Sequence, residues 1–524
     1  MPKNFVACDR DQQMLLPTDM REWLPAEHLV WLVIDSVEQL DLSAFYDWTP
    51  EERGRPAFDP KMMVTLLLYA YAMGIRSARE IERRIQDDVA LRVIAAGATP
   101  DHSTICRFRT RYREPLSDLF VSVVGLCARA GLVRPQVVAI DGTKVAANAS
   151  QSKNLTRDQL EDYARRVFDE AERIDQQENE LYGERRGDEL PEHLRKRPER
   201  IEWLRRELAA QEEADVKTHQ RRMKERADKQ ASGFAILGTE PQPPKKKTCR
   251  INWTDPDSRV QKTSGDYLQG YNAQAAVTGD QVIVAADLVA DTNDYHQLEP
   301  MITQAKDNLD AAGAAQPIGT VVADAGYFSD DNAILEAGPE LLIAPTSTKN
   351  LAKTIANRRP PPTDDREAEL RWWRAEVALA ELYARRREAV IDGYLAGQVT
   401  LREVTESLGV SVAYAYWLAT TKRNHGWIPG ARPPKPPPSP SGADILLERF
   451  ARPGALDTYR MRAQTVEPVF GQLKEQRRMR RLLHRGLDAC RCEWRMMATA
   501  HNLRKLLSSR GRRLFSLMSF APTA

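Results

Sequence analysis

A chain of 524 residues is too long for one compact core, so we expect several domains. Charged residues make up 29% of the sequence and hydrophobic residues 42%, which is typical of a soluble protein with highly charged surfaces. The longest apolar stretch, residues 62–73, is too short to span a bilayer, and the N-terminus has no apolar signal core. We therefore expect a cytoplasmic protein. The net charge of +2 says little about its partners, because it averages over strong local imbalance.

Several classes of site are disfavoured by the absence of their motifs. The six cysteines are scattered, and the one close pair, Cys490 and Cys492, has no second pair to complete a zinc site, so reduced thiols are expected. The eight histidines are dispersed, and none pairs at the spacing of helical metal ligands. A P-loop ATPase is disfavoured because no G-x-x-x-x-G-K-[ST] run occurs. Serine or tyrosine recombination is not expected either, because no nucleophile is flanked by clustered arginines.

The first 125 residues are expected to form a helical domain. Residues 60–74 and 78–95 carry apolar residues at helical spacing. Gly74 and the GATPDHS stretch interrupt the pattern and separate the helices.

A further helix is expected in STICRFRTRYR (103–113), with Ser103 or Thr104 as its cap. Ile105 and Phe108 can pack into a core while the arginines of the same helix contact DNA or solvent. The predicted DNA contacts on this helix are Arg107 and Arg109.

The texture then changes to mixed α/β. Short β-branched or apolar runs predict strands, and residues 271–289 read as two strands joined by a tight turn. The expected strands are 136–141, 271–277, 281–289, 320–324 and 341–345. One helix between them has a single apolar face made of Leu298, Met301, Ile302, Ala305 and Leu309.

Two insertions interrupt this material. Residues 154–232 are dense in charge and carry helical stripes on either side of a Gly- and Pro-containing break, which predicts a helical hairpin that acts as a spacer or a dimer contact. The Pro- and Lys-rich residues 241–248 form a linker. Residues 363–445 are the second insertion, which is helical and ends in a stiff proline tract.

Within the second insertion, residues 401–423 have the pattern of a helix-turn-helix. Leu401, Val404 and Leu408 would pack the first helix, and Gly409 would make the turn. A second helix would face inward through Ala415 and Leu418 and contact DNA through Ser411, Ala413, Tyr414, Lys422 and Arg423, together with Arg402 from the first helix. Such helical pairs also occur without DNA, so both interpretations stay open.

Three acids stand at positions that suit metal chemistry. Cleavage of a phosphodiester needs a hard divalent cation, and two or three carboxylates converging on one pocket suffice to hold it. Asp141 and Asp324 each end an expected strand and are each followed within two residues by glycine. Ligands gather beyond strand ends in open α/β sheets, although an Asp-Gly step can also be only a turn.

The third acid, Glu467, is expected on a helix that starts near Arg462 and has Val466, Phe470 and Leu473 as its apolar stripe. Lys474 lies about two turns further and projects from the same side as Glu467. An acid and a lysine on one face can equally be an ordinary solvated surface.

These strands, acids and helices together resemble a known family. The order strand–Asp, hairpin, helix, strand–Asp, helix, strand and Glu-bearing helix resembles the RNase H-like core of bacterial insertion-sequence transposases of the DDE class. The segment YRMRAQTVEPVFGQLK supplies the Tyr, Arg, Glu and Lys of one branch's signature as Tyr459, Arg462, Glu467 and Lys474, with an Arg-to-Glu gap one residue longer than the pattern. Residues 54–109, 254–259 and 270–277 resemble other segments of the same transposases, in family order.

The resemblance implies an RNase H-like fold with a mixed five-stranded sheet flanked by helices and an all-α N-terminal domain. The two helical insertions come from the residue pattern instead, and residues 363–445 match no part of that family. The expected domains are a DNA-binding domain (1–125), the core (126–153 and 250–350), a hairpin insertion with linker (154–240), the second insertion (363–445), and the Glu helix with a basic C-terminal region (455–513).

By the same resemblance, Asp141, Asp324 and Glu467 would hold Mg²⁺, with Mn²⁺ as a substitute. Lys474 and Arg462 would contact phosphate. Asp255, Asp257 and Arg259 either border the cleft or form a local turn with an ion pair.

A basic segment follows the third acid. From Lys474 to Arg513, thirteen Lys or Arg face three acids, which favours phosphate contact over a merely solvated surface. The predicted DNA-binding residues in this segment are Lys474, Arg477, Arg478, Arg480 and Arg481, and the resemblance adds Tyr459 and Arg462 before it.

The preferred hypothesis is a transposase that cleaves the ends of its element and transfers the 3′-hydroxyl to target DNA. Its partners would be the terminal inverted repeats and target DNA, and pairing two ends would need at least a homodimer. A non-catalytic DNA-binding protein derived from a transposase is the alternative, and a nuclease with the same core is a third possibility.

Overall fold

The computed structural model describes residues 20–47, 57–166, 192–231, 250–345 apart from 264, 315, 336 and 337, 387–408, and 442–508 apart from 451, together with a few isolated positions. The chain divides into two compact units. The larger contains residues 1–327, 336–341 and 457–524, and the smaller contains residues 328–335 and 342–456. In the described parts, no helix is both long and apolar enough to cross a membrane.

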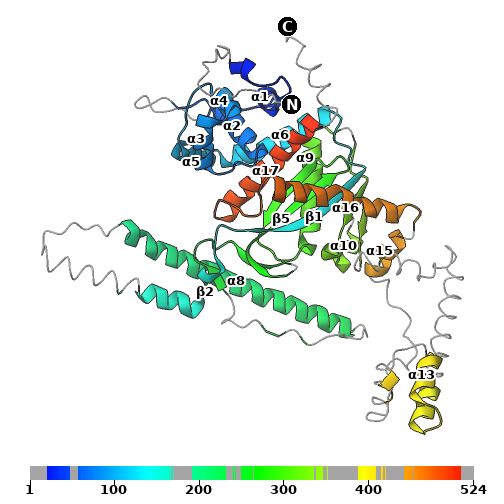
Figure 1. Ribbon diagram of the computed structural model, residues 1–524. Coiled ribbons are helices and arrows are strands. Elements are labelled where there is room, and N and C mark those ends of the chain that lie inside the picture. Colours follow the sequence, from blue (N-terminus) through cyan, green and yellow to red (C-terminus); the bar gives the residue numbers. More distant parts are fainter. Residues whose placement is uncertain are drawn as a thin grey trace, which may run out of the picture. The chain divides into compact units, whose positions relative to one another are not determined.

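The N-terminal part is helical, as expected. Helix α2 is buried over nearly its whole length, from Met63 to Ala72, which makes it the centre of this bundle. Its elements are η1 (Met20–Trp23), α1 (Leu29–Glu38), η2 (Ser43–Phe45), α2 (Pro60–Ala72), α3 (Ala78–Asp87), α4 (Val89–Ala95), α5 (His102–Arg111) and α6 (Arg113–Arg129). Figure 1 shows α1 to α5 grouped around α2.

Aspartates begin three of these helices, because a short carboxylate can accept the otherwise unpaired N–H groups of a first turn. Asp88 accepts hydrogen bonds from Ala90 and Leu91, and so splits the expected helix 78–95 into α3 and α4. Asp101 caps α5 by accepting from the Thr104 N–H at 2.7 Å. The expected Ser103 or Thr104 cap is therefore wrong by two or three residues.

The sheet has six strands among the described residues, rather than the expected five. Its order is β4-β5-β1-β7-β8, with β6 also paired to β5. The strands are β1 (Val137–Ala146), β4 (Arg259–Lys262), β5 (Tyr267–Thr278), β6 (Ile283–Val289), β7 (Thr320–Ala323) and β8 (Glu340–Ile343). The additional strand arises because β5 begins at Tyr267, before the expected 271, and its early residues pair with β4 while its later residues pair with β6.

Strand β1 is longer than expected and does not end at Asp141. It pairs in parallel with β7 only over Val137–Ile140, but its antiparallel pairing with β5 continues from Val138 to Ala146. Strand β5 thus continues to pair with β1 after β7 has ended. Asp141 therefore lies mid-strand, at the residue where β1 loses its neighbour on one side.

Helices cover the sheet. Helix α9 (Leu298–Ala311) packs on β6 through the apolar face that its sequence predicts, and all five residues of that face are buried. Helix α17 (Leu487–Ser508) packs on both α6 and β6, so it joins the N-terminal bundle to the sheet (Figure 1). Trp494 of α17 is 1% exposed and its indole donates to the carbonyl of Gln274 on β5 at 3.0 Å.

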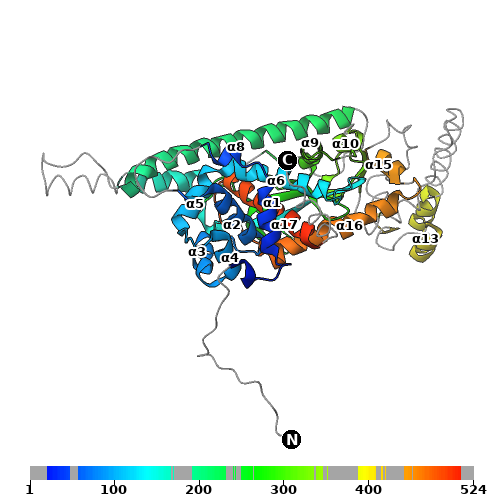
Figure 2. The ribbon, with the colours of Figure 1, turned by 90° about the horizontal axis from the view of Figure 1, so that it is seen from above.

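The first insertion begins as a strand. Residues 154–156 form β2 (Asn154–Thr156), which pairs with β3 (Arg250–Asn252) after the short η3 (Gln151–Lys153). Residues 157–166 are helical and pack beside the 40-residue helix α8 (Glu192–Ala231), seen in Figure 2. The expected break near Gly183, Gly187 and Pro191 lies outside the described residues, as do Val167, Ala171 and Ile174 of the expected stripe.

Two ion pairs set the direction of these helices. Arg157 pairs with Glu212, and Glu161 pairs with Arg205, so the helices run antiparallel. Between them lie Leu160, Leu204 and Leu208, with Ile251 of β3 and, in a neighbouring cluster, Ala164 and Ile201.

The smaller unit contains α10 (Asp330–Ile334), α13 (Leu401–Leu408) and α15 (Gly442–Phe450). Val404 of α13 is fully buried with Ile391, Ala415 and Ala419, and Leu401 and Leu408 pack against this cluster. Arg402 pairs with Glu406 on the same helix. Residues 409–414, 417, 418 and 420–423 lie outside the described residues, so the turn and most DNA contacts of the expected helix-turn-helix stay predictions.

Candidate active site

Two aspartates lie side by side where β1 and β7 part. Ile140 pairs with Ala323 in the parallel register, so the next residues, Asp141 and Asp324, project from neighbouring positions. Asp324 follows the last residue of β7 and precedes η7 (Ala325–Tyr327), as its sequence predicts. Asp324 Oδ1 accepts the Gly326 N–H at 2.9 Å, which fixes the turn. The register of two strands therefore brings together acids that are far apart in the sequence.

The Asp141 carboxylate is largely, but not fully, buried, and its partners only partly compensate the loss of water. Burial raises its pKa to about 7, and the negative charges of Asp324 and Asp294 act in the same direction. The guanidinium of Arg462 opposes the rise, donating to Asp141 Oδ2 at 2.8 Å, as does the Gly142 N–H at 2.8 Å. The positive charge of Arg462 therefore offsets only part of the effect of burial and of the negative charges of Asp324 and Asp294 on Asp141.

The third acid reaches this place through Arg462. Helix α16 (Ala455–Gly471) carries both residues, and Arg462 donates to Glu467 Oε1 at 3.2 Å while it holds Asp141. The Arg462 side chain is 14% exposed and that of Glu467 is 55% exposed. The helix begins at Ala455, earlier than expected, because its first turn is not part of the Val466–Phe470–Leu473 stripe. That stripe is buried, as predicted.

A proline directly follows Glu467 inside the helix. Pro468 cannot donate to the carbonyl four residues earlier, that of Gln464, which accepts from Gln281 Nε2 at 3.1 Å instead. Gln281 lies in the β5–β6 turn and also accepts from His501 and Lys505 of α17. The Glu-bearing helix is therefore tied to the sheet at its proline.

Lys474 contacts the same strand as Asp141. It lies in a π-helical turn, Gln472–Gln476, and its ammonium donates to Thr143 Oγ1 and to the carbonyl of Lys144 at 3.1 Å. Such turns add one residue to a helical turn and occur often at functional sites. Here the turn places Lys474 on the free edge of β1, two residues beyond Asp141.

Sequence patterns missed a fourth carboxylate, Asp294. It precedes η6 (Tyr295–Gln297), and its Oδ1 accepts from Asn272 Nδ2 at 2.6 Å and Gln274 Nε2 at 2.9 Å. Lys144 lies 3.6 Å from the same oxygen. The residue stands in an irregular polar loop after β6, and no periodicity or strand end marks it. The only available signal is its place in an acid-rich segment, DLVADTND.

The basic segment after the Glu helix is attached to β1 as well. The Ala146 N–H donates to the Arg480 carbonyl at 3.1 Å, and Leu482 donates back to the Ala146 carbonyl at 2.8 Å. Asn148 donates to the Leu483 carbonyl at 2.9 Å and accepts from Arg481. This loop, residues 477–486, therefore continues the edge that β7 leaves open.

Comparison with protein families agrees with this architecture. A model described as a transposase domain (DUF772) matches residues 18–111, and two models described as transposase DDE domains match residues 213–389 and 443–507. The chain belongs to the insertion-sequence transposases of the DDE class. The matched ranges include Asp324 and Glu467 but not Asp141. The transposase matches no curated protein and no solved structure.

The basic loop of this transposase has an exposed and a buried side. Arg478, Arg480 and Arg481 are exposed, whereas Met479 and Leu482 are buried beneath them. Arg478 adopts a left-handed backbone conformation with φ 56°, which helps the chain reverse here. The exposure of these three arginines leaves their contact with phosphate a prediction.

Two residues expected to contact DNA are buried instead. Arg477 is 3% exposed, its guanidinium contacts His501 Nδ1 at 3.0 Å, and burial lowers its pKa to about 10. Tyr459 is 2% exposed. In this structure neither side chain can reach a phosphate, because the alternation of the loop and of α16 turns them inward.

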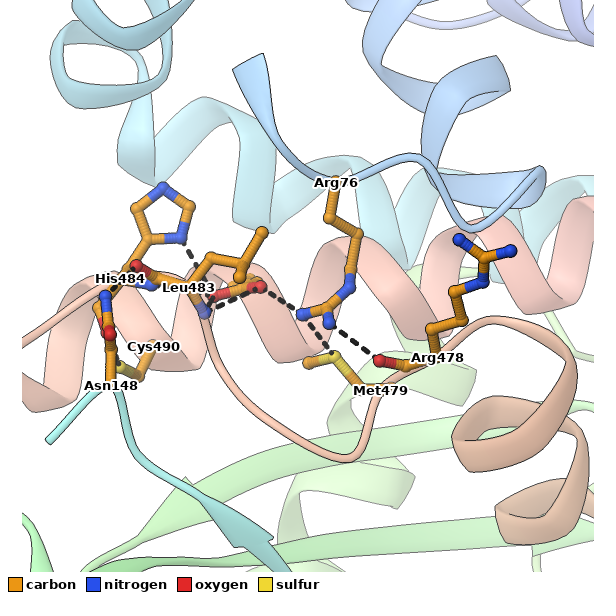
Figure 3. Close-up of polar contacts among 8 residues, drawn as sticks. Arg76, Asn148, Arg478, Met479, Leu483, His484 and Cys490 are labelled. Atoms are coloured by element: carbon orange, nitrogen blue, oxygen red, sulfur yellow. Dashed lines mark hydrogen bonds and ion pairs between the residues drawn. The ribbon is translucent and has the colours of Figure 1, made fainter. Parts of the chain in front are cut away.

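An ion pair anchors the basic loop to the N-terminal bundle (Figure 3). Arg76 donates to Glu493 Oε1 at 2.6 Å and to the Arg478 carbonyl at 2.7 Å. Glu493 also accepts from the Leu483 N–H at 2.9 Å and lies 2.9 Å from His484 Nδ1. Burial alone would raise the pKa of Glu493, but the hydrogen bond and charge of His484 and the charge of Arg76 lower it below its ordinary value.

The two arginines of α5 that are expected to contact DNA differ in exposure. Arg107 is exposed, with one guanidinium nitrogen 3.3 Å from Thr104 Oγ1. Arg109 is half-buried, and its guanidinium lies 5.3 Å from the centre of the Tyr71 ring. Ile105 and Phe108 are buried, as predicted.

The TDPDSR segment has a structural role in this transposase. Asp255 accepts from the Gly486 N–H at 3.0 Å and from the Tyr271 hydroxyl at 2.8 Å, and Asp257 accepts from the Leu487 N–H at 2.8 Å. The two acids therefore hold the start of α17. Arg259 donates to the carbonyls of Pro256 and Ser258, so the expected local turn is present, but its partners here are backbone carbonyls and not the carboxylates of the expected ion pair.

DDE transposase domains generally use divalent metal ions. Within the parts of the chain that the structure describes, no three His, Cys, Asp or Glu side chains converge as a preformed metal site. The donor chemistry nevertheless fits, because Asp141 and Asp324 offer hard carboxylate oxygens from neighbouring strands. The oxygen Asn272 Oδ1, on the fully buried Asn272, also lacks a hydrogen-bond partner among the described residues.

Proposed function

We propose that this transposase cleaves DNA at the ends of its element and joins the freed 3′-hydroxyl to target DNA, with Asp141, Asp324 and Glu467 as its catalytic acids. The observation that carries the proposal is the Ile140–Ala323 register, which sets Asp141 beside Asp324. The link from Asp141 through Arg462 to Glu467 supports the third acid. The mixed sheet with flanking helices supports an RNase H-like core.

Divalent ions, Mg²⁺ or Mn²⁺, held by these acids would activate the attacking oxygen and stabilise the leaving oxygen. The protein's own part is to hold the oxygen donors on neighbouring strands. Arg462 keeps Asp141 and Glu467 oriented before an ion arrives, and can turn to a phosphate afterwards. Lys474, fixed on β1 by Thr143 and Lys144, supplies a point charge for a phosphate near Asp141.

DNA would be held by exposed arginines on both sides of the acids. Arg478, Arg480 and Arg481 on the basic loop would bind the phosphates nearest the cleaved bond, because that loop is hydrogen-bonded to β1. Arg107 on α5 would belong to the N-terminal domain, residues 1–125, that recognises the terminal repeats. The segment 401–423 would be a second DNA contact. Pairing of two ends would make the active form at least a homodimer.

Cleavage of labelled DNA that carries the element's own ends tests this proposal. We expect magnesium-dependent cutting by the wild type, and no cutting by Asp141→Asn, Asp324→Asn or Glu467→Gln, although each variant still binds the ends. Asp280→Asn is the matched control, because Asp280 pairs with exposed Arg134 at the β5–β6 turn. If the wild type binds the ends but never cuts, a non-catalytic DNA-binding protein is the better description. If one variant still cuts, that acid is not catalytic.

A further inference from the structure

We infer that Asp294, together with Asn272, is a further oxygen-donor pair of the divalent-ion site. This inference rests on the proposed function, because it assumes an ion at Asp141 and Asp324. The juxtaposition that carries it is that Asp294 lies against both glycines that follow those acids. Asp294 lies in none of the motifs found in the sequence, and Asn272 lies in the segment 270–277 without having been assigned a role there.

The two glycines leave room that Asp294 uses. A Cβ atom on Gly142 would lie 2.5 Å from Gln274 Nε2 and 2.7 Å from Asp294 Oδ1, both closer than real contacts allow, so Asp294 shares this space with the amide that holds it. A Cβ atom on Gly326 would lie 3.0 Å from Asp324 Oδ1 and 3.3 Å from Asp294 Oδ2. Neither glycine has a left-handed φ, so the backbone does not require glycine there. The absence of a side chain instead lets the carboxylates of Asp294 and Asp324 approach the same small space.

The two oxygens of Asp294 have different surroundings. Oδ1 accepts from the amides of Asn272 and Gln274, and Lys144 lies on that side too. Oδ2 lies on the side of Gly326 and Asp324. The amides therefore fix the carboxylate through one oxygen and leave the other directed toward the second strand-end acid. This is how a carboxylate is oriented in advance for an ion.

Asn272 gives an independent sign of a ligand. It is fully buried on β5, and its Nδ2 donates to Asp294. Its Oδ1 has no donor among the residues that the structure describes, and it would lie 3.0 Å from a Cβ on Gly142. An unpaired buried carbonyl is costly, so a site that contains one is suited to a partner from outside the chain. A hard cation or its water shell supplies that partner, because amide and carboxylate oxygens are what it prefers.

A simple ion pair with Lys144 does not account for this arrangement. The Lys144 ammonium is 3.6 Å from Asp294 Oδ1 and donates to the Thr292 carbonyl at 3.0 Å. It therefore uses the oxygen that the amides already occupy, and neither Asp294 Oδ2 nor Asn272 Oδ1.

Binding of Mn²⁺ alone to the full-length protein, followed by electron paramagnetic resonance, tests the inference without any activity readout. We expect Asp294→Asn to weaken Mn²⁺ binding by roughly 10-fold or more, as the loss of a supporting metal-site carboxylate does elsewhere. Asparagine keeps an acceptor for Asn272 and Gln274, so the fold is retained. Asp280→Asn is the matched control, and we expect it to bind Mn²⁺ like the wild type.

A second variant changes no charge. Gly326→Ala places a methyl group between Asp324 and Asp294, so we expect it to weaken Mn²⁺ binding as well. Gly471→Ala is its control, because a Cβ there meets nothing within 4 Å. Melting without metal checks that each variant folds.

The outcomes separate the two proposals. If Asp141→Asn and Asp324→Asn lose Mn²⁺ binding while both Asp294→Asn and Gly326→Ala keep it, Asp294 is not part of the site and the proposed function stands. If neither Asp141→Asn nor Asp324→Asn changes Mn²⁺ binding, the ion site of the proposed function is wrong and this inference falls with it.

Discussion

Two carboxylates within the larger unit are both removed from water, but their surroundings are opposite. The Glu493 side chain is 0% exposed and the Asp141 side chain is 16% exposed. Glu493 has Arg76, His484 and backbone N–H groups as partners, and its pKa lies below the ordinary value despite burial. Asp141 has Arg462 and one N–H, faces two other carboxylates, and its pKa rises to about 7.

The difference separates structural from functional burial. A buried carboxylate with a structural role is paired with cations and accepts enough hydrogen bonds to replace those it lost from water. A carboxylate short of such partners destabilises the protein by itself, and such groups gather at functional sites. The Arg76–Glu493 ion pair therefore holds the basic loop in place. The negative charge of Asp141 and its neighbours Asp324 and Asp294 is not fully balanced by nearby positive charge.

Removing the compensated acid should have the largest effect on stability. We expect Glu493→Ala to lower the free energy of unfolding by about 3–5 kcal/mol, because Arg76 would remain buried without its partner. The melting temperature would fall by roughly 10 °C. Glu475→Ala is the control: it breaks the exposed pair with Arg480 and should cost under about 1 kcal/mol. Equal melting of the two variants would contradict the comparison.

Removing the uncompensated acid should have the opposite sign. The pKa of Asp141 is raised from 3.8 to about 7, so the folded protein binds this proton more tightly than the unfolded chain does, and stability falls as pH rises from about 4 to 7. We therefore expect Asp141→Asn, in chelator, to melt roughly 5 °C above the wild type at pH 8. The gap should close toward pH 4. A variant that melts below the wild type at pH 8 would show that Arg462 already compensates the charge.

The exposed arginines of the basic loop should affect stability least. We expect Arg481→Ala to change the free energy of unfolding by no more than about 0.5 kcal/mol, because Arg481 is exposed and its contact with Asn148 is at the surface. Its binding to element ends should nevertheless weaken, and the slope of log K against log salt should fall by about 1. An unchanged slope would mean that Arg481 touches no phosphate.

Regular patterns in the sequence predicted the elements well. The β5–β6 hairpin, the buried face of α9 and the buried stripe of α16 follow from period and burial, and all three are confirmed. The position of Asp324 directly after β7 is confirmed for the same reason, since a short apolar run followed by Asp-Ala-Gly can continue as a strand no further.

Features that depend on distant partners could not be predicted. Whether β1 ends at Asp141 depends on how far β5 and β7 extend beside it, and its own residues do not record that. Arg477 and Arg478 are identical in sequence terms, yet one is buried and the other exposed, because a turn with positive φ separates them. Asp294 lies in a loop where no periodicity applies, so only the folded chain brings it to the other acids.

The edge of β1 that β7 leaves open has a consequence for the synthesis of the protein. The strand that carries Asp141 is covered on that edge by residues 474–482, which leave the ribosome more than three hundred residues later. Contacts of such sequence separation form late. A nascent chain, or one terminated before residue 462, therefore lacks Arg462, Glu467 and Lys474 beside Asp141, and the proposed acids come together only after Glu467 has been synthesised.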